Sequence, residues 1–311
     1  MDVFAASTRA NNRAGQAANG LPITMTRSRF TWRLRTQSLA LGERTIFMGI
    51  VNVTPDSFSD GGTYFARDAA LAHALQLLAE GADILDLGGE STRPNATPVT
   101  SDEEQARILP VLTAILRVRP EAIISVDTYH SQTALAAVDL GAEIVNDVSG
   151  LLWDDRMAEV LSQGKPGAVL MHTRGTPQDW GNLPPLTSGE IVPLVRSGLV
   201  ATLAMALQAG IAPESIVIDP GFGFGKLGGA NHTLLAHLSE LHDLGYPLLT
   251  GTSRKRFLTA GLAKPTEADR AYATTASNVA CILAGAHILR VHDVAAAQTA
   301  SFVADAILNA H

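Results

Sequence analysis

The 311-residue sequence lacks several features that mark whole classes of protein. It has one cysteine, Cys281, so no disulfide can form within the chain. No uninterrupted apolar run reaches the roughly 18 residues that indicate a membrane span. Basic residues are also few, since 23 Lys and Arg face 30 Asp and Glu for a net charge of -7. Because nucleic-acid binding needs clustered cations, we expect no nucleic-acid or membrane partner and a location in the reducing cytoplasm.

Aromatic residues are scarce as well, at 5% of the chain, whereas 46% is hydrophobic and 27 residues are glycine. The apolar content therefore consists mostly of Ala, Val, Ile and Leu, which suit contacts between helices and strands. This composition favours an α/β fold. The length fits two average domains, or one α/β barrel of about 250 residues with an extension.

Residues 1–28 lack apolar periodicity and the charged-then-apolar layout of a secretory signal, so we expect a disordered N-terminal extension. A tail or cloning remnant is favoured over an organellar transit peptide, which the Ala, Ser and Arg content also resembles. Residues 29–311 are predicted to form the folded domain. Apolar and polar residues alternate at its start, around Phe30, Trp32 and Leu34, which predicts a hairpin.

From residue 46 onward one unit repeats: a short β-branched strand, a polar or glycine-containing loop and an Ala/Leu-rich helix. Strands are predicted at 46–53, 83–89, 122–128, 143–149, 168–172, 215–221, 247–251 and 287–293. Helices are predicted at 68–80, 103–117, 131–140, 155–163, 190–209, 231–242, 267–284 and 295–308. Eight such units without a linker predict a single (β/α)8 TIM barrel with an N-terminal β-hairpin, rather than an open doubly wound sheet.

Seven of the eight predicted strands turn polar at their carboxyl ends. The residues concerned are Asn52, Asp86, Glu90, Asp127, Asn146, Asp147, His172, Asp219, Arg290, His292 and Asp293. A single Asp or Asn at such a position can simply cap the next helix or turn. The same explanation does not cover seven strands at once. Because these strand ends converge on one face of a barrel, they predict a ligand site there.

The motifs at these strand ends match a known family. In order they are "GIVNVTPDSFSDGG", "GGESTRP", "SVDT", "VNDVSG", "LMH", "IDPGFGFGK", "GTSRKRF" and "RVHD". Together they resemble the dihydropteroate synthases over about residues 45 to 309. The "GFGFG" at 221–225 is not a dinucleotide-binding fingerprint, because its glycine spacing is wrong and it opens no obvious helix.

The resemblance implies a transferase that joins 6-hydroxymethyl-7,8-dihydropterin pyrophosphate to para-aminobenzoate. Its pterin-binding residues would include Asp219, whose carboxylate can accept two hydrogen bonds from the pterin edge. The family pattern adds Asp127 and Asn146 on the same ring and Lys255 as a donor on its other edge. Apolar walls would come from Met171 and Phe224, although a Met on a strand is often simply core.

The pyrophosphate is expected to need cations. The family pattern gives this role to Arg290 and His292, which lie two residues apart and so project to the same side of the last strand. An ion pair with Asp293 or Glu90 is the structural alternative for them. Asn52 would help to hold Mg²⁺ together with pyrophosphate oxygens, since magnesium takes few protein ligands. No metal cage is predicted.

Two loops are expected to close over the aromatic amine, "TPDSFSDGG" after the first strand and "ESTRPN" after the second. The resemblance assigns contacts with para-aminobenzoate to Phe58, Thr92, Pro94 and Ser253. It assigns catalysis to Asp56, Asp60, Thr92, Arg93 and Lys255. Asp56 or Asp60 could stabilise a developing cation, but both also suit a turn. No general base is expected, because the protein mainly stabilises the leaving group and excludes water.

Two other functions share part of this pattern. A methyltetrahydrofolate methyltransferase has the same barrel, but it needs neither a pyrophosphate clamp nor the "SRK" and "STRP" loop chemistry. A noncatalytic pterin-binding paralogue would keep the pocket and lose the loops, and both loop sequences are intact here. The resemblance therefore favours the synthase. It also implies a homodimer through the last helices, whose Ala-rich sequence equally suits packing within the barrel.

Overall fold

A computed structural model describes residues 27–53, 62–90 and 98–310, without the side chains of 62–66. Eight parallel strands form one sheet in the order β8-β7-β6-β5-β4-β3-β10-β9. A bridge between Ile218 and Leu248 joins the two outermost strands and closes the sheet into a barrel. The strands are β3 (Ile46–Asn52), β4 (Ile84–Gly88), β5 (Ile123–Asp127), β6 (Ile144–Asp147), β7 (Gly167–Met171), β8 (Ile216–Asp219), β9 (Leu249–Thr250) and β10 (Ile288–Val291).

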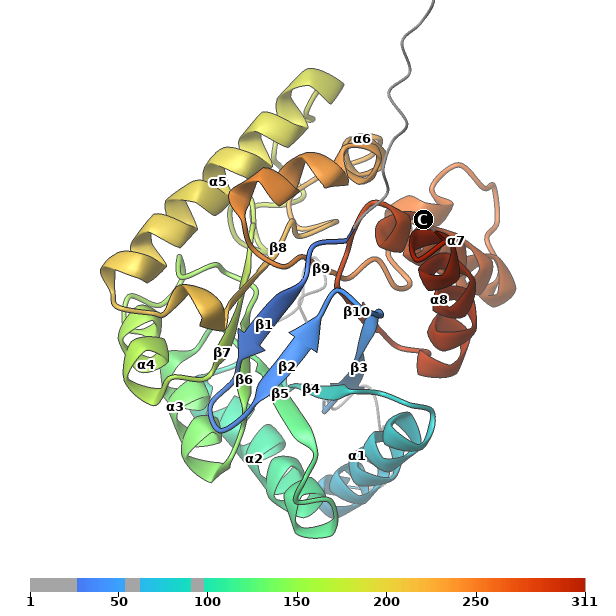
Figure 1. The fold of residues 1–311 in the computed structure, drawn as a ribbon. Helices are drawn as coiled ribbons and strands as arrows, with labels where there is room; N and C mark the ends of the chain where they lie inside the picture. Colours follow the sequence, from blue (N-terminus) through green and yellow to red (C-terminus); the bar gives the residue numbers. More distant parts are fainter. Residues whose placement is uncertain (1–26, 54–61, 91–97, 311) are drawn as a thin grey trace, which may run out of the picture.

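Helices surround this barrel on the outside (Figure 1). They are α1 (Gly62–Ala79), α2 (Ser101–Val118), α3 (Ser131–Leu140), α4 (Met157–Gly164), α5 (Ser188–Gln208), α6 (Ala230–Ala236), α7 (Glu267–Leu283) and α8 (Val294–Leu308). Short 3-10 helices lie at Pro213–Ser215, Leu238–Leu244 and Arg256–Thr259. The (β/α)8 prediction and all eight predicted strands are confirmed.

Alternate residues along each strand belong to two different cores. Outward-facing residues such as Leu85, Ile124 and Val145 pack with the helices in one large cluster. Inward-facing residues such as Ile84 and Ile144 form a second cluster inside the barrel. The period of two in a β-strand therefore decides which residues reach the barrel interior.

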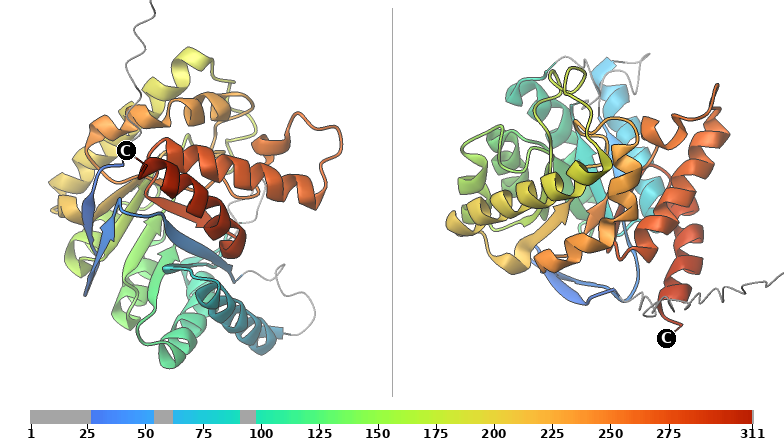
Figure 2. Two further views of the ribbon diagram at one scale, coloured as in Figure 1. Left: turned by 45° about the vertical axis from the view of Figure 1, so that its right-hand side comes forward. Right: turned by 90° about the horizontal axis from the view of Figure 1, so that it is seen from above.

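The predicted N-terminal hairpin is confirmed and closes one end of the barrel. Its strands β1 (Phe30–Arg33) and β2 (Ser38–Leu41) are antiparallel and cross that end in Figure 2. Trp32 is fully buried among the inward-facing residues, and its Nε1 donates to the Ser215 carbonyl at 2.8 Å. A Cβ on Gly167 would lie 3.2 Å from the Trp32 ring, so glycine makes room for this plug.

The described chain begins two residues before the predicted boundary at 29. The Arg27 guanidinium is buried and donates to Thr45, to the Ala286 carbonyl and to Asp305 on α8. These contacts join the start of the described chain to the last helix. The rest of the predicted extension, residues 1–26, lies outside the described residues.

One helix in the described part of the chain, α5, is long and apolar enough to cross a membrane by length and composition. Glu190 and Arg196 interrupt its apolar sequence, so this helix contains no uninterrupted apolar run of about 18 residues. Its buried face, including Val195 and Leu199, packs against β7 and α6. Core helices of barrels share this composition, so α5 is explained by its place in the fold.

Candidate active site at the carboxyl end of the barrel

The predicted ligand-binding side chains occupy the inward-facing positions at the carboxyl ends of the strands. Asp127 is paired in register with Gly88 on one side and with Asn146 on the other. Asn146 and Asp219 are buried. Gly88 has no side chain, and a Cβ there would lie 3.6 Å from Asp127 Oδ2. These residues therefore form one polar layer above the apolar barrel core.

Arg290 lies at the centre of this layer, between two carboxylates. Its Nε donates to Asp86 Oδ2 at 2.6 Å, and its Nη2 donates to Asp127. Asn146 Nδ2 donates to the same Asp86 oxygen at 3.2 Å. Burial lowers the pKa of Arg290, but Asp86 and Asp127 outweigh burial and raise it above the ordinary value. Arg290 is thus a fixed cation.

The alternative partners predicted for Arg290 were wrong. Asp293 instead caps α8 by accepting from the Ala296 N–H at 2.9 Å. Glu90 instead accepts from the Tyr129 hydroxyl at 2.9 Å. Local capping also explains Asp147, whose carboxylate accepts from Ser149 and Leu151 of its own turn. The cap explanation therefore holds for Asp147 and Asp293, but not for Asp86 or Asp127.

Asp219 and Lys255 lie on the opposite side of the layer. Burial raises the pKa of Asp219, and the Lys255 ammonium opposes this shift. Burial also lowers the pKa of Lys255 to about 8, with Asp219 opposing. The Lys255 Nζ donates to the Phe222 carbonyl and lies 4.3 Å from the Phe224 ring centroid. Lys255 therefore keeps its ammonium next to an acceptor, a carboxylate and an aromatic face.

The wall beside Lys255 is the glycine-rich loop after β8. Gly221, Gly223 and Gly225 all have positive φ, near +66°, +82° and +65°, which residues with a Cβ rarely adopt. A Cβ on Gly221 would clash with the His172 carbonyl. Lys226 is buried beneath the loop and donates to three carbonyls, those of His172, Gly221 and Phe224. The glycines therefore shape the wall that carries Phe224.

Ser253 and His292 form a second hydrogen-bonded pair in the site. The Ser253 hydroxyl lies 2.9 Å from His292 Nδ1, and the backbone N–H of His292 donates to that hydroxyl at 3.3 Å. Ser253, predicted for the aminobenzoate, thus lies directly beside His292, predicted for pyrophosphate. Met171 is buried at the end of β7, close to Gly221, so it packs in the core at the rim of the predicted pocket.

Asn52 is exposed at the carboxyl end of β3. Its side chain has no hydrogen-bond partner within residues 27–53, 62–90 and 98–310, so its amide oxygen is free to bind a hard cation. No group of three or more His, Cys, Asp or Glu side chains in these ranges could hold a metal ion. This single amide oxygen fits a magnesium ion whose other ligands are water molecules and oxygens of a bound substrate.

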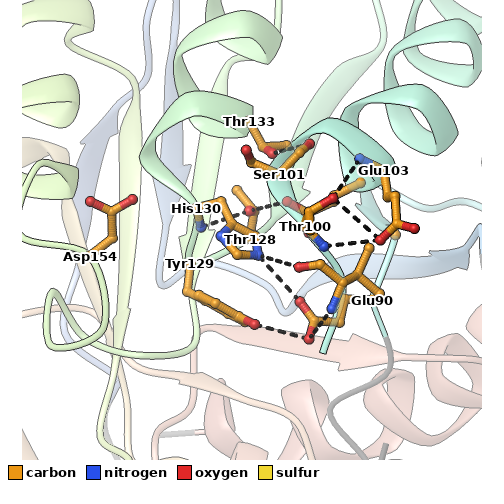
Figure 3. Close-up of polar contacts among 12 residues, drawn as sticks. Glu90, Thr100, Ser101, Glu103, Thr128, Tyr129, His130, Thr133 and Asp154 are labelled. Carbon is orange, nitrogen blue, oxygen red and sulfur yellow. Dashed lines mark hydrogen bonds and ion pairs between the residues drawn. The ribbon is translucent and has the colours of Figure 1, made fainter. Parts of the chain in front are cut away.

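A third cluster lies beside the carboxyl ends of β4 and β5 (Figure 3). Glu90 accepts from Tyr129 and, at 3.4 Å, from the Val99 N–H. His130 Nε2 lies 3.0 Å from the Val99 carbonyl and 3.6 Å from Glu90. The Glu90 carboxylate raises the pKa of His130 against the effect of burial. These contacts hold Glu90 and Val99 together. Glu90 directly precedes the segment 91–97, and Val99 follows it after Pro98.

Known proteins resemble this chain over most of its length. Residues 48–292 match the family described as pterin binding enzyme. A dihydropteroate synthase of Synechocystis is 42% identical over 266 residues, covering 86% of this chain and 91% of its own. The Xanthomonas albilineans enzyme in complex with 7,8-dihydropteroate is 39% identical with a TM-score of 0.76, covering 87% of this chain and 96% of that one. The Yersinia pestis enzyme with a sulfonamide drug is 36% identical with a TM-score of 0.81, covering 89% and 99%.

The chain belongs to the dihydropteroate synthase family of pterin-binding enzymes. This membership confirms the resemblance found in the motifs. Of the residues that the motifs predict for a dihydropteroate synthase site, the structure brings ten together at one end of the barrel: Asn52, Asp127, Asn146, Met171, Asp219, Phe224, Ser253, Lys255, Arg290 and His292.

The other predictions for the dihydropteroate synthase site fall on the two closing loops. Asp56, Phe58 and Asp60 lie in residues 54–61, outside the described residues. Thr92, Arg93 and Pro94 lie in residues 91–97, also outside them. Their roles in aminobenzoate binding and catalysis stay predictions.

Three residues that contribute to this site were given no role by the motifs. Asp86 holds Arg290 and Asn146, Lys226 holds the glycine-rich loop, and His130 holds Glu90. Asp86 was recognisable as a polar residue in the inward-facing position of its strand. The role of Lys226 could not be predicted from residue types, because its partners are backbone carbonyls, which every residue has.

Proposed function

We propose that this chain joins 6-hydroxymethyl-7,8-dihydropterin pyrophosphate to para-aminobenzoate, giving 7,8-dihydropteroate and pyrophosphate. The observation that carries this proposal is one polar layer with two kinds of chemistry. Buried carboxylate and amide groups suit a flat heterocycle edge, and a fixed guanidinium beside them suits an anion. Family membership supports the same reaction.

The pterin would lie against Asp219, Asp127 and Asn146, with Lys255 donating to its other edge. Its carbon–oxygen bond to pyrophosphate breaks, the amine nitrogen of para-aminobenzoate forms the new bond to carbon, and the amine loses a proton. Arg290 and His292 bind the departing pyrophosphate. Electrostatic stabilisation of the leaving group is the main contribution of these side chains.

Magnesium belongs to this proposal as a partner of the pyrophosphate. When bound, the ion would neutralise charge on the pyrophosphate oxygens, and Asn52 would supply a single protein ligand. Titrating the protein with pyrophosphate in the presence of Mg²⁺ or of a chelator tests this. Equal pyrophosphate affinity in both solutions would remove the metal from the proposal.

One assay separates the proposed reaction from the alternatives. The protein is incubated with the pterin pyrophosphate, Mg²⁺ and para-aminobenzoate, and the products are weighed by mass spectrometry. A synthase gives dihydropteroate. A methyltetrahydrofolate methyltransferase or a noncatalytic paralogue gives no dihydropteroate, and the absence of this product would overturn the proposal.

Sulfonamides provide an independent test of the aminobenzoate position. A sulfonamide presents the same aniline nitrogen and ring, and the sulfonyl group takes the place of the carboxylate. We expect competitive inhibition against para-aminobenzoate, and binding that requires pyrophosphate and Mg²⁺ to be present first. Tight sulfamethoxazole binding to the protein alone would contradict this order, and no inhibition at low para-aminobenzoate would contradict the site.

A homodimer through α7 and α8 is part of the same proposal. These two helices pack against each other and carry large apolar side chains in solvent. Tyr272 is 74% exposed, Phe302 79% and Val303 57%, and a patch of this kind is typical of a protein interface. Sedimentation should give a dimer for the parent chain and a monomer for Phe302→Asp. A monomeric parent would refute the proposal.

We place the enzyme in the cytoplasm. Its substrates are small polar molecules, and its single cysteine is buried and free. The apolar helix α5 is accounted for by the barrel. Fractionation of cells that express the full chain tests this location, and recovery with the membranes after a salt wash would contradict it.

A further inference from the structure

We propose that Asp86 is a positioning residue that sets the direction of both Arg290 and Asn146. This inference rests on the proposed function, in which Arg290 binds pyrophosphate and Asn146 binds the pterin. Asp86 is fully buried. It would therefore support both halves of the pterin pyrophosphate through other side chains.

The geometry shows one carboxylate oxygen shared by two donors. Asp86 Oδ2 accepts from Arg290 Nε at 2.6 Å and from Asn146 Nδ2 at 3.2 Å. Among the described residues, neither of these two N–H groups has another acceptor. This oxygen thus orients the Asn146 amide and the Nε side of the Arg290 guanidinium, whose Nη2 side is held by Asp127.

The two donors reach Asp86 from opposite directions. Arg290 stands on β10 and Asn146 on β6, and each of these strands is two positions away from β4 in the sheet. The residues in register with Asp86 on the strands between are Ile50 on β3 and Ser125 on β5. Ile50 offers no hydrogen bond, and Ser125 is short, so neither competes for the carboxylate. Asp86 therefore connects strands that make no backbone contact.

The burial of Asp86 indicates a purpose beyond local structure. Its side chain is fully buried, and its second oxygen, Oδ1, has no hydrogen-bond partner within the described ranges. A buried carboxylate is costly unless it is paired with a charge. Asp147 and Asp293 use their oxygens on their own turn or helix, whereas Asp86 uses its bonded oxygen only on two residues of the site.

The sign of one measurement separates positioning from simple charge. Replacing Asp86 by Asn removes a negative charge close to Arg290, so Coulomb attraction alone would strengthen pyrophosphate binding. Loss of positioning has the opposite effect, because Arg290 is no longer held toward the anion. Pyrophosphate affinity must therefore fall in Asp86→Asn if Asp86 acts by position.

The experiment is calorimetric titration of the full chain with Mg²⁺ and pyrophosphate and, separately, with 6-hydroxymethylpterin. Asp86→Asn should weaken each ligand by about tenfold, since a neutral amide oxygen replaces the carboxylate oxygen and the charge-assisted hydrogen bonds become weaker on both sides. Asp86→Glu keeps the charge but moves the carboxylate by one methylene, so it should also weaken both and serves if the Asn variant does not fold. Glu143→Gln is the matched control, a buried acid that binds Thr36 at the other end of the barrel, and it should leave both affinities within about twofold.

Three results overturn the inference. They are tighter pyrophosphate binding in Asp86→Asn, unchanged affinities in both Asp86 variants, and weakening of one ligand alone. A parent chain that binds both ligands and makes dihydropteroate would then keep the proposed function, and only the role of Asp86 would be lost. A parent chain that binds neither ligand overturns the proposed function and this inference together.

Discussion

The two ends of the barrel use the same eight strands and the same inward-facing side, yet they carry opposite chemistry. On several strands an apolar residue at one level is followed two positions later by a charged or polar one. The pairs are Ile84 and Asp86, Ile144 and Asn146, Val217 and Asp219, and Ile288 and Arg290. Two residues of a strand span only about 7 Å. The change from core to site therefore occurs within one layer of side chains.

The polar groups at the two ends differ in what satisfies them. At the amino end Glu143 accepts from Thr36, Arg27 binds Asp305, and His287 binds backbone groups on two sides. At the carboxyl end Asp86 keeps one buried oxygen without a partner in the described part of the chain, and Lys255 has a pKa lowered by burial. The polar groups named at the amino end thus have their partners within the protein, as in a core. Those at the carboxyl end are available to bind a ligand.

Stability and ligand binding are thus divided between the two ends of each strand. Apolar burial near the hairpin stabilises the fold, while the charged layer weakens it in return for ligand contacts. Substitutions at the two ends should therefore differ in kind.

The largest effect is expected for Trp32→Ala at the amino end. Truncating this fully buried ring leaves a cavity and removes the hydrogen bond to Ser215, so we expect the free energy of unfolding to fall by about 3–5 kcal/mol. Denaturant unfolding measures this. Trp32→Phe keeps most of the ring and should lose less. If Trp32→Ala instead reduced pterin affinity of the folded protein at unchanged stability, the division between the two ends would fail.

Acid should also act on the amino end, through His287. Its Nδ1 accepts from the Leu248 N–H and its Nε2 donates to the Ser28 carbonyl. Burial, together with Arg27 and His242 nearby, lowers the pKa of His287 to about 4 from 6.5. Between these values the unfolded chain takes up a proton and the folded chain does not, so stability is lost as the pH falls through this range.

The size of the acid effect follows from the two pKa values. Because one pKa unit corresponds to about 1.4 kcal/mol, the loss should approach roughly 3 kcal/mol. Unfolding curves at a series of pH values measure it. In His287→Gln the curve between pH 4 and 6.5 should be flatter. An equally steep curve in the variant would assign the acid effect to other groups.

The sequence predicted the fold better than it predicted the ends of the elements. All eight strands were found, because β-branched runs bounded by polar loops are a strong pattern. The helix predicted from residue 68 begins at Gly62, since the preceding glycines read as a loop. The helix predicted at 231–242 is α6 followed by a 3-10 helix. The break at His237 has no signal in residue type.

The site was predictable to the extent that it depends on strand position. Asp127, Asn146 and Asp219 were found because they end apolar strands. The shared oxygen of Asp86 was not, because it depends on the curvature of the sheet, which brings side chains of the non-neighbouring strands β6, β4 and β10 together. The pairing of Ser253 with His292 likewise joins residues that lie far apart in the sequence. The motifs therefore predict which residues lie at the site, but not the contacts between residues that are far apart in the sequence.

At the carboxyl end, Asp219→Asn should leave the fold intact and reduce pterin binding. The amide keeps the size of the side chain and can still accept from Gly221, which Asp219 does now at 2.7 Å. It also places a donor against the donors of the pterin edge. We expect a loss of about 1.5–3 kcal/mol in pterin binding free energy. Calorimetry with 6-hydroxymethylpterin checks this, and an affinity within about twofold of the parent would exclude Asp219 from the pocket.

The smallest effect is expected from the titration of Lys255. The folded-state pKa is about 8 against 10.5 for the free side chain, with burial as the main cause. Lys255 therefore carries its proton below about pH 8 and loses it above, at a pH where an exposed lysine would stay charged. If the ammonium donates to the pterin, affinity for 6-hydroxymethylpterin should fall by up to about tenfold between pH 7 and pH 9. The pterin itself can titrate in this range. The parent is therefore compared with Lys255→Met, which is titrated with the same pterin but has no ammonium group at this position. The difference between the two pH profiles reports Lys255 alone. Parallel profiles would show that this lysine stabilises the loop that carries Phe222 and Phe224 and donates no hydrogen bond to the ligand.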